Sequence, residues 1–359
     1  KTYLVLASNN YLGFTHAPEV IEAASRAALK FGTGSSGSRL TTGGTFIASE
    51  LEKRLADFKH SESALVFNTG YMTNLGILYG LLQTGDVVFS DELNHASIID
   101  GCRISRCKVV VYKHNDMADL QRLLETEIVT GQRFIVTDGV FSMDGDIADL
   151  PSLAVLKKQF NACLIVDDAH GVGVIGNDGS GTASHYGLTD VIDLQVGTLS
   201  KALAAEGGYV AGKKILIDYL INRSRPFIFS TALAPATLAA ANAALLLLQT
   251  QASKYLDFLR ANSRLMRRLL LEGGLNVVEG ITPIIPVVIG EAGLTMQFAD
   301  RLKSKGILVS GIRPPTVPRG ESRLRITVTA AHCEEQLRQA AQIITALWQE
   351  LKHGEKKEG

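Results

Sequence analysis

The chain has 359 residues with 36 basic and 36 acidic side chains, so its formal net charge at neutral pH is zero. This balance, without a basic stripe, gives no electrostatic footprint for nucleic acid or an anionic membrane surface, and we expect neither as a partner. The longest apolar run, "LAAANAALLLL" at 238–248, is far shorter than the ~20 residues that cross a bilayer, so small molecules are the expected partners.

Short β-branched runs alternate with stretches of helical periodicity in the first half of the chain. The predicted strands are "SALVFN" at 63–68, "DVVFS" at 86–90, "KVVVYKH" at 108–114, "FIVTDGV" at 134–140, "CLIVDD" at 163–168 and "DLQVGT" at 193–198. The residues 46–60 and 150–161 have apolar side chains at helical spacing. Strands separated by helices predict a parallel sheet that is covered on both faces.

The second half predicts a long helix followed by a smaller α/β lobe. Residues 236–273 are almost wholly helical in pattern, and three strand-like runs follow at 283–290, 306–315 and 323–330, with a helix at 293–306. Two lobes are expected because single cores stop growing at roughly 250–300 residues. The predicted division is an N-terminal segment 1–35, a large domain 36–273, a small domain 274–353 and a solvated tail 354–359.

The segment "LIVDDAHGVGVIGNDGSG" at 164–181 contains a GxGxxG pattern at 171–176. As a dinucleotide fingerprint of an NAD-dependent oxidoreductase, it would need a helix directly after the glycines. The following "NDGSGTAS" consists of turn formers, which favours a tight turn after a functional strand end. Asp167 and His170 lie where parallel sheets bind ligands, although a capping aspartate and an ordinary loop histidine stay open as alternatives.

Lys201 follows the next strand end in "VGTLSKALAAEGGYVAG", among small and apolar residues rather than other charges. Desolvation disfavours the ammonium form, which suits a lysine for Schiff-base chemistry. A lysine and an aspartate at neighbouring strand ends are what pyridoxal 5'-phosphate (PLP) requires. Gly70 and Tyr71 open a helix whose free N–H groups favour a phosphate, and the Thr198 hydroxyl is a further candidate ligand.

Eight segments in this order resemble the α-oxoamine synthase family of fold-type-I PLP-dependent enzymes. They are "SNNYLGF", "GYMTNLG", "DELNHAS", "DGVFSMDGD", "VDDAHGVGVIG", "GTLSKA", "FSTALAP" and "RPPTVPRGESRLRITVTAAH", which together extend over nearly the whole chain. The resemblance implies an aspartate-aminotransferase-like α/β fold. Its large domain would hold a mostly parallel seven-stranded sheet between helices, with a smaller C-terminal α/β domain.

The resemblance also implies roles around the cofactor. Lys201 would form the Schiff base, and Asp167 would pair with the ring nitrogen. His170, assisted by Ser142, would hydrogen-bond the phenolic oxygen, while His95 would stack on the ring. An ordinary loop histidine is the alternative for His95 when its segment is taken alone.

For the substrate carboxylate, the resemblance points to Arg325, assisted by Asn9, and His95 would also contact the substrate. Arg323 shares a strand face with Arg325 if the strand is regular, so Arg325 is preferred on resemblance only. Thr316 matches a position near the acyl substrate. Surface strand or turn residues are the alternative for these positions.

Ser230 and Thr231 match hydroxyls that reach the phosphate from a second subunit, so a homodimer with shared active sites is expected. The implied reaction condenses an amino acid with an acyl thioester and releases carbon dioxide. Within the family, the segments at 166–176 and 313–332 favour L-alanine and a pimeloyl thioester of coenzyme A or of acyl-carrier protein. Another member, such as glycine C-acetyltransferase, stays open as an alternative.

The four cysteines, Cys102, Cys107, Cys163 and Cys333, show no CxxC spacing. A chain of this size needs no disulfide for stability, so they are expected to be reduced thiols of a cytoplasmic protein. The same spacing gives no indication of a zinc site, and no metal is expected.

Overall fold

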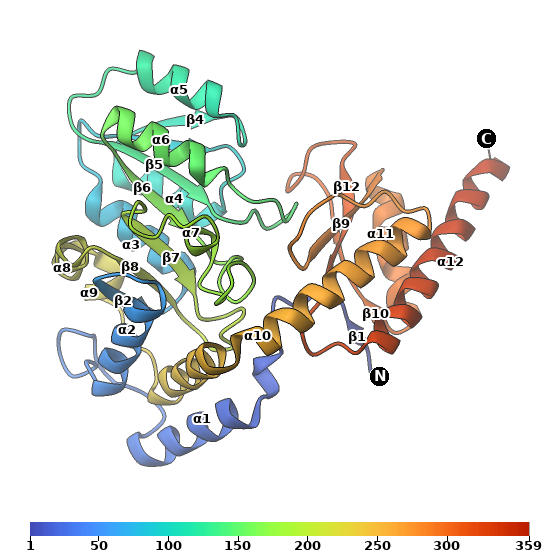
Figure 1. Cartoon of the computed structure of the whole chain (residues 1–359), viewed down its shortest axis with the longest axis horizontal. Coiled ribbons are helices and arrows are strands. Elements are labelled where there is room, and N and C mark those ends of the chain that lie inside the picture. Colours follow the sequence, from blue (N-terminus) through green and yellow to red (C-terminus); the bar gives the residue numbers. More distant parts are fainter. Residues whose placement is uncertain (359) are drawn as a thin grey trace. The chain divides into compact units, whose positions relative to one another are not determined.

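The computed structural model describes residues 1–358, and for residues 353–358 it describes the backbone alone. The chain forms two compact units (Figure 1). The small unit contains Lys1–Gly13, Ser142–Asp146 and Lys254–Gly359, and the large unit contains Phe14–Phe141 and Ile147–Ser253. The domain bounds given from the sequence stay a prediction. The predicted tail at 354–359 lies outside the residues whose side chains are described.

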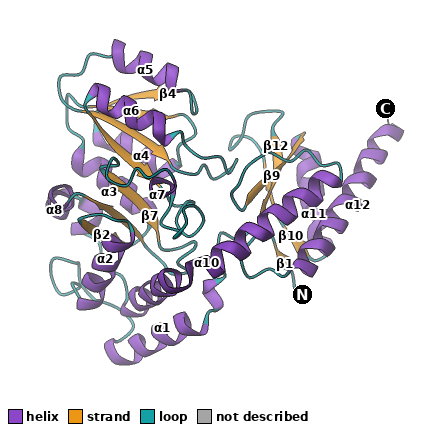
Figure 2. Cartoon of the chain, viewed as in Figure 1, coloured by secondary structure: helices purple, strands orange, loops and turns teal. Residues whose placement is uncertain are grey.

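A seven-stranded sheet forms the centre of the large unit (Figure 2). Its strand order is β2-β8-β7-β6-β5-β3-β4. β8 is antiparallel to both of its neighbours and the other pairs are parallel, which confirms the predicted fold class. All six strands predicted between 63 and 198 are present. The predicted six are β2 (Ser63–Phe67), β3 (Val87–Asp91), β4 (Lys108–Tyr112), β5 (Arg133–Asp138), β6 (Ala162–Asp167) and β7 (Leu194–Thr198), and the seventh strand is β8 (Gly208–Gly212).

Helices cover both faces of this sheet because successive strand residues point to opposite sides. On β5, Phe134 and Val136 pack with one set of helices, and Ile135 between them packs with the other. The first set is α3 (Gly70–Leu81), α4 (Ala96–Ser105), α8 (Lys214–Arg223) and α9 (Arg225–Ile228). The second is α5 (Met117–Thr126), α6 (Leu150–Phe160) and α7 (Thr182–His185). The unit also contains η1 (Phe14–His16), α1 (Pro18–Phe31) and α2 (Phe46–Phe58).

The carboxyl ends of the parallel strands carry a row of acidic residues. Asp91, Asp138 and Asp167 are the last residues of β3, β5 and β6, and all three are buried. Asp138 and Asp167 are paired in register, so their backbones are direct neighbours. Because ligands of parallel α/β sheets bind at this edge, these ends position the candidate site.

The small unit contains an antiparallel sheet, order β11-β12-β9, and a parallel pair of β1 with β10. Its core includes Phe298 and Trp348, whose rings stack with centroids 5.7 Å apart. The elements are β1 (Leu4–Val5), β9 (Ile284–Gly290), α11 (Ala292–Ser304), β10 (Ile307–Leu308), β11 (Ser310–Ile312), β12 (Ser322–Thr327) and α12 (Glu334–Glu358).

The long helix α10 (Pro235–Glu272) belongs to both units, as its residues up to Ser253 lie in the large one and the rest in the small one. Its backbone departs from helical geometry at Gln251, two residues before this boundary, where φ is −133° and ψ is 26°. Within the described part of the chain, no helix combines the length and the apolar character needed to span a membrane.

Candidate active site

The Asp167 carboxylate, at the end of β6, is fixed by donors on both of its oxygens. Oδ2 accepts from Asn74 Nδ2 on α3 at 2.6 Å, and Oδ1 accepts from the Ala169 backbone N–H at 3.0 Å. The side chain is buried, at 6% exposure. Short hydrogen bonds to an ionised acceptor are strong, so the carboxylate is held in one orientation.

His95 is the N-cap residue of α4 and is tied to the same strand edge. Its Nδ1 accepts from the Ser97 backbone N–H at 3.2 Å and lies 2.8 Å from Ser97 Oγ. Its own backbone N–H donates to Asp138 Oδ2 at 2.9 Å. These three contacts fix His95 relative to α4 and to the end of β5.

Lys201 lies close enough to this edge to change the titration of its neighbours. Desolvation lowers the pKa of His95, the Lys201 ammonium lowers it further, and the Asp167 carboxylate opposes both. Burial raises the pKa of Asp138 well above its ordinary value, and the Asp167 charge adds to the rise while Lys201 reduces it. The structure therefore brings Lys201, Asp167 and His95 together, and adds Asp138 to them.

The loop that carries Lys201 is held by the end of β7. Thr198 Oγ1 accepts from the Ser200 backbone N–H at 3.2 Å and donates to the Gly207 carbonyl at 3.0 Å. Ala204, whose N–H donates to the Lys201 carbonyl, has a φ of 53°, a conformation that costs a non-glycine residue energy. Local strain of this kind is typical of functional loops.

Thr198 also packs against the first turn of α3, where Gly70 lies. A Cβ at Gly70 would lie 3.4 Å from Thr198 Cβ, and a Cβ at Gly208 would lie 2.6 Å from Gly70 N. The N-cap residue Thr69 accepts from Met72 N–H at 3.0 Å. The N–H groups of Gly70 and Tyr71 precede that bond, in the turn where helix N–H groups have no intrahelical partner. The Tyr71 hydroxyl donates to Asp100 Oδ2 at 2.6 Å.

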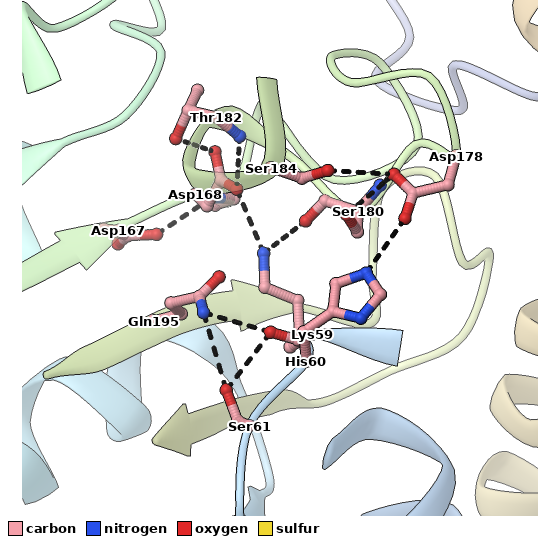
Figure 3. Close-up of polar contacts among 11 residues, drawn as sticks. Lys59, His60, Ser61, Asp167, Asp168, Asp178, Ser180, Thr182, Ser184 and Gln195 are labelled. Carbon is pink, nitrogen blue, oxygen red and sulfur yellow. Dashed lines mark hydrogen bonds and ion pairs between the residues drawn. The ribbon is translucent and has the colours of Figure 1, made fainter. Parts of the chain in front are cut away.

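The loop 169–181, which contains His170, is anchored by a buried ion pair (Figure 3). Lys59 Nζ lies 3.1 Å from Asp168 Oδ2 and also donates to the Ser180 carbonyl. Asp168 further accepts from the Thr182 backbone N–H and hydroxyl, each at 2.9 Å. Both charged side chains are almost fully buried, at 0% and 2% exposure. Asp168 therefore ties both ends of the loop to Lys59, the residue that follows α2.

The glycines of 171–181 have structural roles in this loop. A Cβ at Gly171 would lie 1.9 Å from Asp168 Oδ1, and one at Gly181 would lie 1.7 Å from Oδ2. Gly173 and Gly176 have φ of 70° and 87°, where glycine is favoured. Residues 171–179 form turns and bends, so no helix follows the GxGxxG pattern directly. A dinucleotide fingerprint needs that helix, and the tight turn is what the structure has.

The predicted substrate residues lie in the small unit. Arg325 Nε donates to the Ser142 carbonyl at 2.5 Å, and both of its terminal nitrogens lie 3.2 Å from Asn9 Oδ1. Arg325 is buried at 5% exposure, yet no carboxylate of the described residues lies within ion-pair distance of it. Arg323, by contrast, pairs with Asp144 and Glu321. The uncompensated charge is a physical reason to prefer Arg325 over Arg323 as the ligand of a carboxylate. The sequence pattern alone gave no such reason.

The other predicted residues, Ser230, Thr231 and Thr316, lie outside the named helices and strands. Thr231 pairs with Ser38 in an isolated bridge, and its carbonyl accepts from Asn68 Nδ2 at 2.7 Å. Thr231 is exposed and Ser230 is half-buried. Thr316 is exposed, and its backbone N–H donates to the Arg313 carbonyl at 3.1 Å.

A match to a family model decides which family the chain is part of: "Aminotransferase class I and II" matches residues 1–344. The chain belongs to this family. Within it, the 8-amino-7-oxononanoate synthase of Lysinibacillus sphaericus is 49% identical over 337 residues, covering 94% of this chain and 86% of the relative. This identity confirms the resemblance to α-oxoamine synthases.

Solved structures agree with this family assignment. The 8-amino-7-oxononanoate synthase of Francisella tularensis is 30% identical with a TM-score of 0.82, and the match covers 98% of both chains. A structure described as "SPT with PLP internal aldimine" is 33% identical with a TM-score of 0.95, covering 98% of this chain and 89% of that chain. The fold-type-I assignment is thereby confirmed.

Sequence reasoning missed several residues that hold the site together. They are buried and polar: Lys59, Asn74, Ser97, Asp138 and Asp168. Asn74 gave a usable signal, since a buried asparagine inside the apolar helix "GYMTNLGILYGL" requires a hydrogen-bond partner. Lys59 gave none, because it follows a surface helix whose pattern suits a solvated lysine.

Proposed function

We propose that this PLP-dependent enzyme condenses L-alanine with a pimeloyl thioester of coenzyme A or of acyl-carrier protein. The products are 8-amino-7-oxononanoate, carbon dioxide and the free thiol, and the reaction belongs to biotin synthesis. The observation that carries the proposal is the gathering of Lys201, Asp167 and His95 at one strand edge. The chain around them is 49% identical to a relative named 8-amino-7-oxononanoate synthase.

The residues of the large unit fit the cofactor. PLP, when bound, supplies an aldehyde that reacts with amines and a ring that withdraws electrons. The fixed Asp167 carboxylate suits the protonated ring nitrogen, and the Lys201 amine suits the aldehyde. The N–H groups of Gly70 and Tyr71, with the Thr198 hydroxyl packed beside them, suit the phosphate. Gly208 supports this fit, because any side chain there would reach Gly70 N.

Three further residues complete the proposed cofactor contacts. His95, held by α4 and Asp138, would stack on the face of the ring. His170, on the loop anchored by Asp168, would hydrogen-bond the phenolic oxygen, and Ser142 would assist. The position of His95 thus depends on hydrogen bonds to Ser97 and Asp138.

Lys201 is the proposed general base. Its amine takes the α-proton of the amino acid at Nζ, because it lies among small residues near Asp167 and His95. The Lys201 side chain is half-buried, and its amine must be in the neutral form to accept this proton. The Asp167 carboxylate accepts from two donors, which hold it in one position at the strand edge.

Arg325 is the proposed ligand of the substrate carboxylate. Its guanidinium is buried and paired with neutral oxygens, so a carboxylate would supply the missing charge. Asn9 fixes the terminal nitrogens and assists in this contact. Thr316 is the proposed contact to the acyl chain, and His95 also faces the substrate.

The proposed assembly is a cytoplasmic homodimer in which Ser230 and Thr231 reach the phosphate of the other subunit. Thr231 is exposed in this chain, which leaves its hydroxyl accessible to such a partner. Acyl-carrier protein is the proposed alternative to coenzyme A as carrier of the pimeloyl group.

A thiol-release assay tests the reaction. L-alanine, glycine and L-serine are each combined with pimeloyl-, acetyl-, succinyl- and palmitoyl-coenzyme A, and free thiol is measured. We expect the highest kcat/KM for L-alanine with pimeloyl-coenzyme A. Preference for glycine with acetyl-coenzyme A would instead identify glycine C-acetyltransferase, and no release with any pair would contradict the proposed reaction class.

A further inference from the structure

The amide of Asn74 lies between two parts of the site and donates to both. Nδ2 donates to Asp167 Oδ2 at 2.6 Å and to Ser97 Oγ at 2.9 Å. Asn74 and Ser97 are both buried, at 2% and 1% exposure. Because an ionised carboxylate only accepts hydrogen bonds, the NH₂ end of the amide must face Asp167. Both amide protons are therefore committed, one to each partner.

Ser97 extends this order to His95. Its Oγ accepts from Asn74 and lies 2.8 Å from His95 Nδ1, so its own proton is available to donate to that nitrogen. The Ser97 backbone N–H also donates to Nδ1, at 3.2 Å. A proton on Nδ1 would point at this N–H, so Nδ1 must be the acceptor nitrogen. A neutral imidazole then carries its proton on Nε2.

The packing of α3 against α4 makes this chain of hydrogen bonds possible. Gly101 of α4 faces α3, and a Cβ there would lie 2.7 Å from Leu78 Cδ1 and 3.2 Å from the Asn74 carbonyl oxygen. The missing side chain lets the two helices approach closely. Ser97, one turn before Gly101, can therefore reach the Asn74 side chain.

The electrostatic surroundings of His95, like its hydrogen bonds, favour the neutral imidazole. His95 caps the N-terminus of the ten-residue helix α4, where the helix dipole disfavours a positive charge. The charged groups that act on it are Asp167 from β6 and Lys201 from the loop after β7, and Asp138 of β5 accepts its backbone N–H. His95 is an exposed residue, and desolvation is still the largest influence on its pKa, which is lowered.

We infer that Asn74 and Ser97 are positioning residues that hold His95 as a neutral imidazole with its proton on Nε2. They also fix the position of this ring relative to the Asp167 carboxylate. The inference rests on the proposed function for what His95 does there. A neutral ring stacks on the cofactor without adding a positive charge beside Lys201. Its Nε2–H is a donor of fixed direction for an anionic substrate.

The tautomer of His95 can be measured directly by NMR. The full-length holoenzyme is labelled with ¹⁵N-histidine, multiple-bond ¹H–¹⁵N spectra report which ring nitrogen carries the proton, and a His95→Gln variant identifies the signal. We expect the Nε2–H tautomer in the wild type and a titration midpoint below the ordinary value of 6.5. In Ser97→Ala and in Asn74→Ala we expect a measurable share of the Nδ1–H tautomer and an upward shift of the midpoint.

Asn262→Ala is the matched control. Asn262 is also buried, and its amide donates to the Thr329 and His332 carbonyls at 2.9 and 2.8 Å in the small unit. This variant loses as many amide hydrogen bonds, so a general loss of stability appears in it too, while the His95 signal stays unchanged. A wild-type proton on Nδ1 overturns the inference. So does an unchanged His95 tautomer and midpoint in both folded variants. This measurement reports a ring proton and not turnover. Its result therefore does not depend on which acyl thioester or amino acid the enzyme uses.

Discussion

Arg323 and Arg325 lie two residues apart on β12 and are both buried, yet their partners differ in charge. Arg323 is neutralised by Asp144 and Glu321, whereas Arg325 contacts the Ser142 carbonyl, the Asn9 amide and the Thr327 hydroxyl. A buried guanidinium without a carboxylate is costly unless a ligand supplies one. The difference supports, on physical grounds, the proposed role of Arg325 in substrate binding.

Replacing Arg325 by Lys is therefore expected to impair the use of L-alanine. A lysine loses the planar fork, and hydrogen bonds to charged groups contribute about 1.5–3 kcal/mol, so kcat/KM for alanine should fall about 10- to 100-fold. KM for the acyl thioester should change little. Steady-state kinetics with each substrate varied in turn measures both values. The control Arg323→Lys should lower the melting temperature more than it lowers kcat/KM, and the reverse pattern would show that the roles are exchanged.

Asp138 gives a pH-dependent prediction. Its pKa is raised well above 3.8 by burial and by Asp167, so ionisation in the folded state costs free energy. The folded form therefore binds this proton more tightly than the unfolded form does. The free energy of unfolding consequently decreases as the pH rises from 3.8 through the folded pKa of Asp138.

The Asp138→Asn variant, which keeps an oxygen acceptor for the His95 N–H, should remove this cost. In urea unfolding, we expect a higher midpoint than wild type at about pH 8 and no gain at about pH 4. A lower midpoint at the higher pH would mean that the carboxylate stabilises the fold through its bond to His95 more than its charge destabilises it.

At the scale of elements, the loop 169–181 requires glycine at some positions because a side chain would not fit there, and at others because of the backbone conformation. Asp168 lies so close to Gly171 and Gly181 that neither position has room for a methyl group. The carboxylate in turn pairs with Lys59, and removal of one member of a buried pair typically costs about 3–5 kcal/mol. The loop that contains His170 is thus held by its close packing around the Asp168 carboxylate.

Gly181→Ala should consequently destabilise the protein far more than Gly187→Ala. Both glycines have positive φ, 113° and 67°, but nothing lies within 4 Å of a Cβ built at Gly187. The control carries only the conformational penalty of about 1–2 kcal/mol, and the Gly181 variant adds a clash with Asp168. Thermal unfolding and cofactor absorbance measure the two effects. Equal losses of stability would show that space around Asp168 is not limiting.

At the scale of the whole molecule, one prediction concerns subunit exchange. Lys201→Ala chains and Ser230→Ala/Thr231→Val chains are each expected to have low activity. If sites are shared across a dimer, random mixing makes half of the dimers mixed with one intact site each, and activity recovers to about a quarter of wild type. The activity of a mixture refolded or exchanged together measures this. Activity equal to the mean of the two separate variants would indicate sites built within one chain.

Much of the fold was predictable because its determinants are local. The six strands from β2 to β7 have β-branched or aromatic runs, and α2 and α6 have helical periodicity. β8 was missed, since "GYVAG" contains two glycines and only one β-branched residue. Its glycines are explained by contacts that no local pattern reveals: a Cβ at Gly212 would lie 2.3 Å from the Asp193 carbonyl oxygen.

In the candidate site, too, some residues could be predicted from local sequence and others could not. Asp167, Lys201 and His95 could be found because each follows a strand end in a recognisable segment. Asn74, Ser97 and the Lys59–Asp168 pair depend on contacts between residues far apart in the chain, such as the 109 positions between Lys59 and Asp168. Such pairs follow from tertiary packing, so a single sequence predicts at most that a buried polar residue needs a partner.

The central claim is that the Lys201 amine holds the PLP aldehyde beside Asp167. Borohydride reduction of the purified protein turns an imine into a stable amine, and peptide mass spectrometry then locates the pyridoxyl group. We expect the added mass on Lys201 alone, and none in a Lys201→Ala variant that keeps the wild-type circular dichroism spectrum. Modification at a different lysine, or no modification of protein that carries PLP absorbance, would contradict it.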